Sequence, residues 1–115
     1  MKRKIIPDII PNQRIHTMSP DNTVFEAAKL MVNQDIGAIV ITGKDELMAG
    51  IVTERDLTRR VLAKGLDPKS VSVGDIMTAN PDTVGPGDSA LEALEIMRIR
   101  RYRHLPVVED GKVVG

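Results

Sequence analysis

The sequence predicts a mixed α/β (α+β) fold made of two tandem β-α-β-β-α units related by pseudo-two-fold symmetry. Three observations support this fold class. The 115-residue chain repeats one pattern of residue types at a nearly constant offset. Each copy contains a stretch with helical periodicity behind a capping signal, and each continues into two apolar runs separated by a polar turn.

The repeat covers three pairs of segments that match residue class for residue class. Residues 23–31 correspond to 89–97, residues 36–41 to 102–107, and, after one extra residue in the first copy's turn, residues 45–50 to 110–115. A self-similar chain of this kind is built from supersecondary units that cannot bury their apolar faces alone. We therefore place the first copy in residues 1–70 and the second copy in residues 71–115.

A helix follows the first strand of each copy. In the first copy, Thr23 is followed three residues later by Glu26, which is the spacing of a capping box. The apolar side chains behind this signal fall on one helical face: Val24, Ala27, Ala28 and Met31. Because Ser89 and Glu92 repeat the spacing in the second copy, we expect the same cap there.

Two strands and a second helix complete the unit. Apolar runs at residues 38–41 and 105–108 have the length of strands, and each leads through a polar turn into a second apolar run. In the first copy this hairpin continues into a helix over residues 53–62, with Gly65 placed as its C-terminal cap. The second copy ends at Gly115, before the counterpart of this helix, so we expect a truncated second repeat.

The composition excludes several classes of function. Basic and acidic residues balance to no net charge, and Phe25 and Tyr102 are the only aromatic residues, which argues against a nucleic-acid partner. The chain has no cysteine for a disulfide or a thiolate zinc site, and no apolar run long enough to cross a membrane. It also shows no catalytic triad, metal cluster or phosphate-binding loop. We therefore assign no catalytic residue, metal ligand or required cofactor, and expect a cytoplasmic protein that is not an enzyme.

The most informative motif is Gly-x-x-Thr-x-x-Asp at residues 50–56. Asp56 would lie in the first turn of the second helix, where a short carboxylate can accept two hydrogen bonds from a diol. Free helix N–H groups near Thr53 and Glu54 would suit a phosphate. Thr53 and Asp56 also have the spacing of a helix cap, so a structural role and a binding role are both open.

Together these features resemble the CBS (cystathionine-β-synthase-type) domain pair. The resemblance rests on the doubled unit, on the motif at residues 50–56, on Ser19-Pro20 and Gly85-Pro86 ahead of the first helices, and on Leu105-Pro106-Val107-Val108 in a strand. It implies a regulatory module that binds an adenine nucleotide, such as AMP, ATP, NAD or S-adenosylmethionine, in a cleft between the two repeats. It also implies that two such pairs associate, so we expect a homodimer.

The resemblance also implies roles for individual residues. Asp56 would accept both ribose hydroxyls and Thr53 would contact a phosphate, with Arg55 beside them in the same turn. The residues expected to frame the adenine and the phosphates are Gly85, Pro86, Tyr102, Arg103, His104 and Pro106. A second cleft would use Ser19, Pro20, Ile36, Gly37 and Ala38, although the second copy ends before its own Gly-x-x-Thr-x-x-Asp motif.

Alternatives accompany three of these assignments. Arg98, Arg100 and Arg101 fit a solvated helix face, whereas Arg103 and His104 enter the next strand and favour phosphate contact. Tyr102 fits either a packing role or the wall of the cleft. For the whole chain, a dimerisation or interaction module without any ligand is the alternative function.

Overall fold

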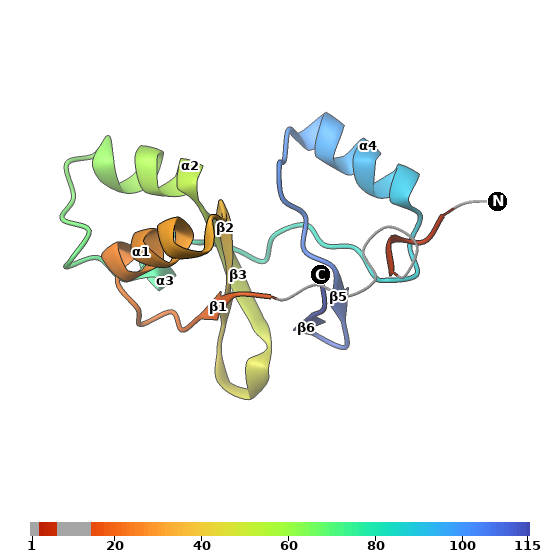
Figure 1. Cartoon of the computed structure of the whole chain (residues 1–115), viewed down its shortest axis with the longest axis horizontal. Coiled ribbons are helices and arrows are strands. Elements are labelled where there is room, and N and C mark those ends of the chain that lie inside the picture. Colours follow the sequence, from red (N-terminus) through yellow and green to blue (C-terminus); the bar gives the residue numbers. More distant parts are fainter. Residues whose placement is uncertain (1–2, 7–14) are drawn as a thin grey trace. The chain divides into compact units, whose positions relative to one another are not determined.

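The computed structural model describes residues 3–6 and 15–115 and divides the chain into two compact units (Figure 1). Unit 2 is His16–Pro81, and unit 1 combines the described residues before His16 with Asp82–Gly115. Helices and strands are interleaved along the chain, which confirms the predicted mixed fold class. The division near residue 70 separates the two copies in the sequence and stays a prediction.

Unit 2 is built around a mixed sheet. Within its described residues the strands are β1 (Thr17–Met18), β2 (Ala38–Thr42), β3 (Met48–Thr53) and β4 (Thr78–Ala79), in the order β1-β2-β3-β4. β1 runs parallel to β2, whereas β2–β3 and β3–β4 are antiparallel. A 3-10 turn, Lys44–Glu46 (η2), joins β2 to β3, so the predicted hairpin is confirmed.

Helix α1 (Val24–Gln34) forms as its sequence predicts. The Thr23 hydroxyl accepts a hydrogen bond from the Glu26 N–H at 3.1 Å, and a Glu26 carboxylate oxygen accepts one from the Thr23 N–H at 3.1 Å. Val24, Ala27 and Met31 are buried on the face turned to the sheet. This face packs into one cluster with buried residues of the strands and the later helices: Ile39, Ile41, Val52, Leu57, Val61, Val73 and Ile76.

The second helix of unit 2 starts where β3 ends. α2 (Glu54–Leu57) continues directly into a π-helical turn, Thr58–Leu62 (η3). Gly65 follows with φ +71°, in the left-handed region that glycine adopts without steric cost, so its predicted role as the helix stop is confirmed. Figure 1 shows α1 and α2 on the same side of the sheet.

The segment that leads out of unit 2 is also part of its core. α3 (Val73–Ile76) is held by the turn before α1, because Val73 N–H donates to Asn22 O at 2.8 Å and Gly74 N–H donates to Pro20 O at 2.9 Å. Val73 and Ile76 are buried. β4 then pairs with β3, so residues after the predicted copy boundary complete the sheet and core of the first copy.

Unit 1 repeats this plan with fewer elements. Its described elements are α4 (Ala90–Arg100), β5 (Val108–Glu109) and β6 (Lys112–Val113), the two strands forming an antiparallel hairpin. Asp110 and Gly111 at the turn both have positive φ, as in the two-residue hairpin turns that match the twist of the strands. Its buried core cluster consists of Ile5, Val84, Ala93 and Val107.

Equivalent contacts recur in the two units at the offset that the sequence repeat predicts. The parallel pair Met18–Ile41 of unit 2 corresponds to the parallel bridge Val84–Val107 of unit 1. Asp88 is the counterpart of Asn22 at this offset, and its carbonyl accepts a hydrogen bond from Ile5 N–H at 3.1 Å, as Asn22 O accepts one from Val73 N–H in unit 2. The N-terminal segment therefore contacts the second copy as the α3 segment contacts the first.

One predicted cap does not form. Ser89 occupies the N-cap position of α4 with extended backbone angles, but its side chain makes no capping hydrogen bond. The Ser89 hydroxyl is buried and has no hydrogen-bond partner among the described residues. The prediction of a second capping box is therefore wrong, since the hydroxyl lacks the geometry that Thr23 has in the first copy.

Candidate functional site

The motif at residues 50–56 forms the junction between β3 and α2. Thr53 is the last residue of β3 and the N-cap of α2. Its hydroxyl accepts a hydrogen bond from the Asp56 N–H at 3.2 Å, and Asp56 Oδ2 accepts one from the Thr53 N–H at 2.9 Å. The structural role weighed from the sequence, a reciprocal helix cap, is therefore present, and the binding role stays a prediction.

The start of β2 lies beside this cap. Ala38 is paired with Thr53 across the β2–β3 ladder, and Gly37 O accepts a hydrogen bond from the Glu54 N–H at 3.0 Å. The structure thus places Ile36–Gly37–Ala38, predicted for the second cleft, next to the motif at residues 50–56. It also corrects one expectation, because the Thr53 and Glu54 N–H groups are not free for a phosphate. The Asp56 carboxylate and the Gly37 carbonyl already accept them.

Arg60 approaches Asp56 from the next turn of the same helix. Its Nε lies 3.7 Å from Asp56 Oδ1, and its guanidinium Nη1 donates a hydrogen bond to Ile76 O at 2.8 Å. The Asp56 side chain is only 14% exposed, whereas that of Arg60 is 43% exposed. One carboxylate oxygen therefore serves the cap and the other faces a cation at the edge of solvent, while Arg55 is exposed.

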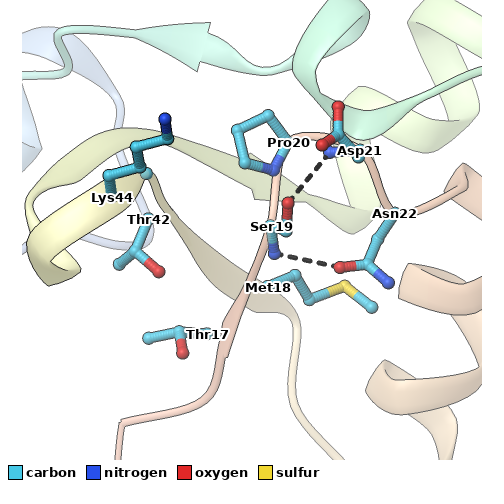
Figure 2. A pocket seen from close by; sticks show the side chains of 9 residues that line it. Thr17, Met18, Ser19, Pro20, Asp21, Asn22, Thr42 and Lys44 are labelled. Atoms are coloured by element: carbon cyan, nitrogen blue, oxygen red, sulfur yellow. Dashed lines mark hydrogen bonds between the residues drawn. The ribbon is translucent and has the colours of Figure 1, made fainter.

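Ser19 and Pro20 lie at the opposite end of β2 from residues 36–38. They line an open pocket of about 630 Å³ formed by residues 17–22 and 42–44, where β1 and β2 end (Figure 2). Ser19 N–H donates to Asn22 Oδ1 at 2.9 Å and the Ser19 hydroxyl accepts from Asp21 N–H at 3.2 Å. These short-range bonds shape the turn before α1. The structure does not bring Ser19 and Pro20 together with residues 36–38.

The predicted site residues of unit 1 fall into two groups. Gly85, Pro86 and Pro106 use their backbone groups within the unit: Gly85 N–H donates to Asp88 Oδ2 at 2.7 Å, Pro86 O accepts from Ile6 N–H at 3.0 Å, and Pro106 O accepts from Val84 N–H at 3.1 Å. Pro106 is buried, whereas Arg103 and His104 are exposed after the end of α4.

Tyr102 has a defined partner. Its hydroxyl donates a hydrogen bond to Asp82 Oδ2 at 2.8 Å, and Arg100 Nε lies 3.9 Å from the same oxygen. This hydrogen bond, with the nearby negative charge, raises the pKa of Tyr102 above its ordinary value of 10.0. Arg98 pairs with Glu95 on the exposed surface of α4 at 3.0 Å, which agrees with a solvated helix face.

Some contacts of the motif are not predicted by the sequence analysis. Arg60 lies four residues after Asp56, a spacing that places two side chains on one helical face and could have suggested an ion pair. Nothing in the sequence indicates that the Gly37 carbonyl or the Ile76 carbonyl would be partners in this region.

In the part of the chain that the structure describes, no three His, Cys, Asp or Glu side chains gather to hold a metal ion. None of the described helices has the length and apolar character needed to cross a membrane.

A comparison with protein families assigns this architecture. The model of the CBS domain matches residues 6–63 and again residues 73–115. The chain belongs to the CBS domain family. Pairs of CBS domains are in general regulatory, ligand-binding modules.

Individual CBS proteins support the family assignment. The chain is 41% identical over 99 residues to the CBS domain-containing protein CBSCBSPB2 of Arabidopsis thaliana, an alignment that covers 86% of this chain and 18% of the relative. It is 40% identical to the mitochondrial CBS domain-containing protein CBSX3 of the same plant, covering 83% of this chain and 48% of the relative. The chain thus spans less than half the length of these two relatives.

Solved structures share the fold. A crystal structure of an uncharacterized conserved protein from Pyrococcus horikoshii superimposes with a TM-score of 0.90 at 32% identity, covering 100% of this chain and 85% of that one. The hexameric CBS-CP12 protein from bloom-forming cyanobacteria superimposes with a TM-score of 0.87 at 28% identity, covering 100% of this chain and 67% of that one. The predicted membership of the CBS domain family is confirmed.

Proposed function

We propose that this CBS domain pair is a regulatory module that binds an adenine nucleotide through Thr53 and Asp56. The observation that carries the proposal is the environment of the Asp56 carboxylate. It is mostly buried, oriented by the Thr53 N–H, and faced by the Arg60 guanidinium. A carboxylate held in this way is a preorganised acceptor, because its orientation is set before a ligand arrives.

The cap and the ligand can share this carboxylate. An ionised carboxylate has about four lone-pair positions, and the hydrogen bond from the Thr53 N–H occupies one of them. The remaining positions can accept the two hydroxyl groups of a ribose, which are donors. The Thr53 hydroxyl accepts the Asp56 N–H and still has its own proton to donate to a phosphate oxygen.

The predicted phosphate contacts of unit 1 have suitable chemistry. Arg103 is exposed, always charged, and able to bind a phosphate with two parallel hydrogen bonds. His104 is exposed beside it. These properties support the assignment of both residues as phosphate ligands. The proposal gives the chain no catalytic role.

The test is titration calorimetry of ligand-free protein with AMP, ATP, NAD and S-adenosylmethionine, using wild type, Asp56→Asn and Asp45→Asn. Asparagine keeps an oxygen for the Thr53 N–H but loses charge and one acceptor, so Asp56→Asn should weaken binding by about 10- to 100-fold. Asp45→Asn makes the same chemical change in the exposed η2 turn and should bind as wild type does.

A second ligand sharpens this test. 2′-Deoxy-AMP lacks one of the two hydroxyls, so it should bind wild type more weakly than AMP, while Asp56→Asn should discriminate little between the two. Absence of binding by every nucleotide would refute the proposed function. Equal affinities of wild type and Asp56→Asn would refute the role of Asp56.

Exposed apolar side chains support self-association, which is expected both for the nucleotide-binding module and for the alternative, an interaction module without a ligand. Val32 is 79% exposed, Leu62 64% and Leu91 66%, all on helical segments, and apolar side chains of this kind are buried when copies associate. We propose a homodimer, and the hexameric state of the cyanobacterial CBS-CP12 protein supports association in this family. Sedimentation with and without nucleotide separates the alternatives, since a pure interaction module would keep its mass and stability whatever nucleotide is added.

A further inference from the structure

We propose that Arg60 is a positioning residue that couples Asp56 to helix α3, so that a ligand bound at Asp56 changes the stability of the α3 segment. The inference rests on the proposed function for its regulatory meaning. Its structural part, the coupling of Asp56 to α3 through one guanidinium group, can be tested without any ligand.

The coupling is visible in the contacts of a single side chain. Arg60 Nε faces Asp56 Oδ1 at 3.7 Å, while Nη1 of the same guanidinium donates to Ile76 O at 2.8 Å. The guanidinium is a rigid plane with donors pointing in fixed directions, so its two contacts cannot be adjusted independently. A rotation of the Asp56 carboxylate that pulls the guanidinium must therefore strain or lengthen the bond to Ile76.

The Ile76 carbonyl is the group of α3 that Arg60 contacts. It lies in the last turn of the helix, where carbonyl groups have no partner within the helix and need one from outside. A cation at this end of a helix is also favoured by the helix dipole. α3 has only four residues, and the hydrogen bond from Arg60 gives the Ile76 carbonyl a partner from outside the helix.

Helix α3 lies in the segment through which the chain leaves unit 2. Val73 and Ile76 are buried in the core of this unit, and β4 follows directly and pairs with β3. The chain passes from β4 into unit 1 at Asp82. The segment that responds to Arg60 is thus the covalent connection to the second repeat.

Ligand binding has a defined effect on this contact. Hydroxyl groups that donate to Asp56 withdraw part of its negative charge from Arg60, which weakens the attraction across 3.7 Å and frees the guanidinium to bond more closely with Ile76 O. We therefore expect α3 to become more protected when the site is occupied. A role of Arg60 in the cap of α3 alone predicts no effect of Asp56 on α3.

The ligand-free test is amide hydrogen exchange of Met77, whose N–H donates to Val73 O at 2.9 Å and reports the closure of α3. We compare wild type, Asp56→Asn, Arg60→Gln and the double variant of the full chain. Arg60→Gln should raise the exchange rate roughly fivefold, the effect of one lost hydrogen bond. Asp56→Asn should change it measurably in the protein that keeps Arg60 and have no effect when Arg60 is already Gln.

Two controls separate coupling from general destabilisation. Arg59→Gln removes an exposed arginine from the same helical turn and should leave Met77 exchange unchanged. Arg60→Lys keeps the charge near Asp56 but offers one nitrogen, so it should not restore the protection of Met77. Effects of Asp56→Asn that persist in the Arg60→Gln background, or no effect in either background, would overturn the coupling.

The ligand arm uses AMP, ATP, NAD and S-adenosylmethionine as probes on the same proteins. Binding should slow Met77 exchange in wild type, and in Arg60→Gln the probe should still bind, more weakly, without slowing it. Equal slowing in both proteins would overturn the regulatory inference. If no probe binds wild type, the proposed function fails, while the ligand-free comparison still decides whether Arg60 couples Asp56 to α3.

Discussion

Asp82 contacts side chains on both sides of the turn that ends α4 in unit 1. Its Oδ2 accepts the Tyr102 hydroxyl at 2.8 Å and lies 3.9 Å from Arg100 Nε. Arg101, between these two partners in the sequence, has φ +60° and ends the helix in the left-handed conformation. The Asp82 carboxylate therefore contacts residues before and after this turn, which leads the chain toward Arg103.

The hydrogen bond to Asp82 makes a prediction about pH. The pKa of Tyr102 is raised above 10.0 in the folded state, so this bond contributes stability that is complete below pH 10.0 and is lost as the pH rises through the raised pKa. Asp82→Asn should lower the midpoint of tyrosine ionisation toward 10.0. The chain has one tyrosine and no tryptophan, so ultraviolet difference absorbance follows this group alone.

The control for this titration is Asp110→Asn, which changes an exposed carboxylate in the turn between β5 and β6. Its midpoint should equal that of wild type. An unchanged midpoint in Asp82→Asn would contradict the assignment of Asp82 as the cause of the shift.

At the scale of the elements, β4 packs against a glycine of the neighbouring strand β3. Gly50 pairs with Ala79 across the β3–β4 ladder. A Cβ atom at Gly50 would lie 2.6 Å from Thr78 O and 2.7 Å from Met77 Sδ, closer than atoms can approach without displacement. The first glycine of the Gly-x-x-Thr-x-x-Asp motif therefore has a structural role, which is to let β4 approach β3.

Gly50→Ala should destabilise the protein by about 1–3 kcal/mol, because the added methyl group must push the β4 backbone away from β3. Urea denaturation of the full chain measures the change. Gly43→Ala is the matched control, since a Cβ atom there meets nothing within 4 Å. It should shift stability by less than about 0.5 kcal/mol. Equal stabilities of the two variants would show that β4 tolerates the displacement.

For the whole molecule, the units in space and the copies in sequence have different boundaries. The sequence predicts that residues 71–81 begin the second copy, yet α3 and β4 complete the core and sheet of unit 2. In the same way, Ile5 falls in the predicted first copy, residues 1–70, but is buried with Val84 and Val107 in unit 1. Each unit thus includes residues that the predicted boundary assigns to the other copy.

This arrangement predicts which fragment folds. A fragment of residues 16–81 contains the complete core cluster of unit 2 and should unfold cooperatively in urea, whereas residues 16–70 lack Val73 and Ile76 and should show a much weaker transition. Circular dichroism at increasing urea distinguishes them. A fragment 16–70 as stable as 16–81 would mean that α3 and β4 contribute little to this core.

Local features of the chain could be predicted because their causes are local. The Thr23–Glu26 cap and the buried face with Val24, Ala27 and Met31 follow from helical spacing, and the stop at Gly65 follows from its freedom to adopt positive φ. Thr53 and Asp56 were identified by the same kind of spacing. Ser89 has that spacing too but forms no cap, since spacing alone does not place a hydroxyl within bonding distance.

The amino-acid sequence by itself determined the repeat, the fold class and the candidate pair Thr53 and Asp56, because periodicity, caps and turns depend on neighbours within a few residues. Only the tertiary structure decided that Gly37 O accepts the Glu54 N–H and that Arg60 joins Asp56 to Ile76. These partners are 16 or 17 positions apart along the chain, so they meet only when sheet and helices pack.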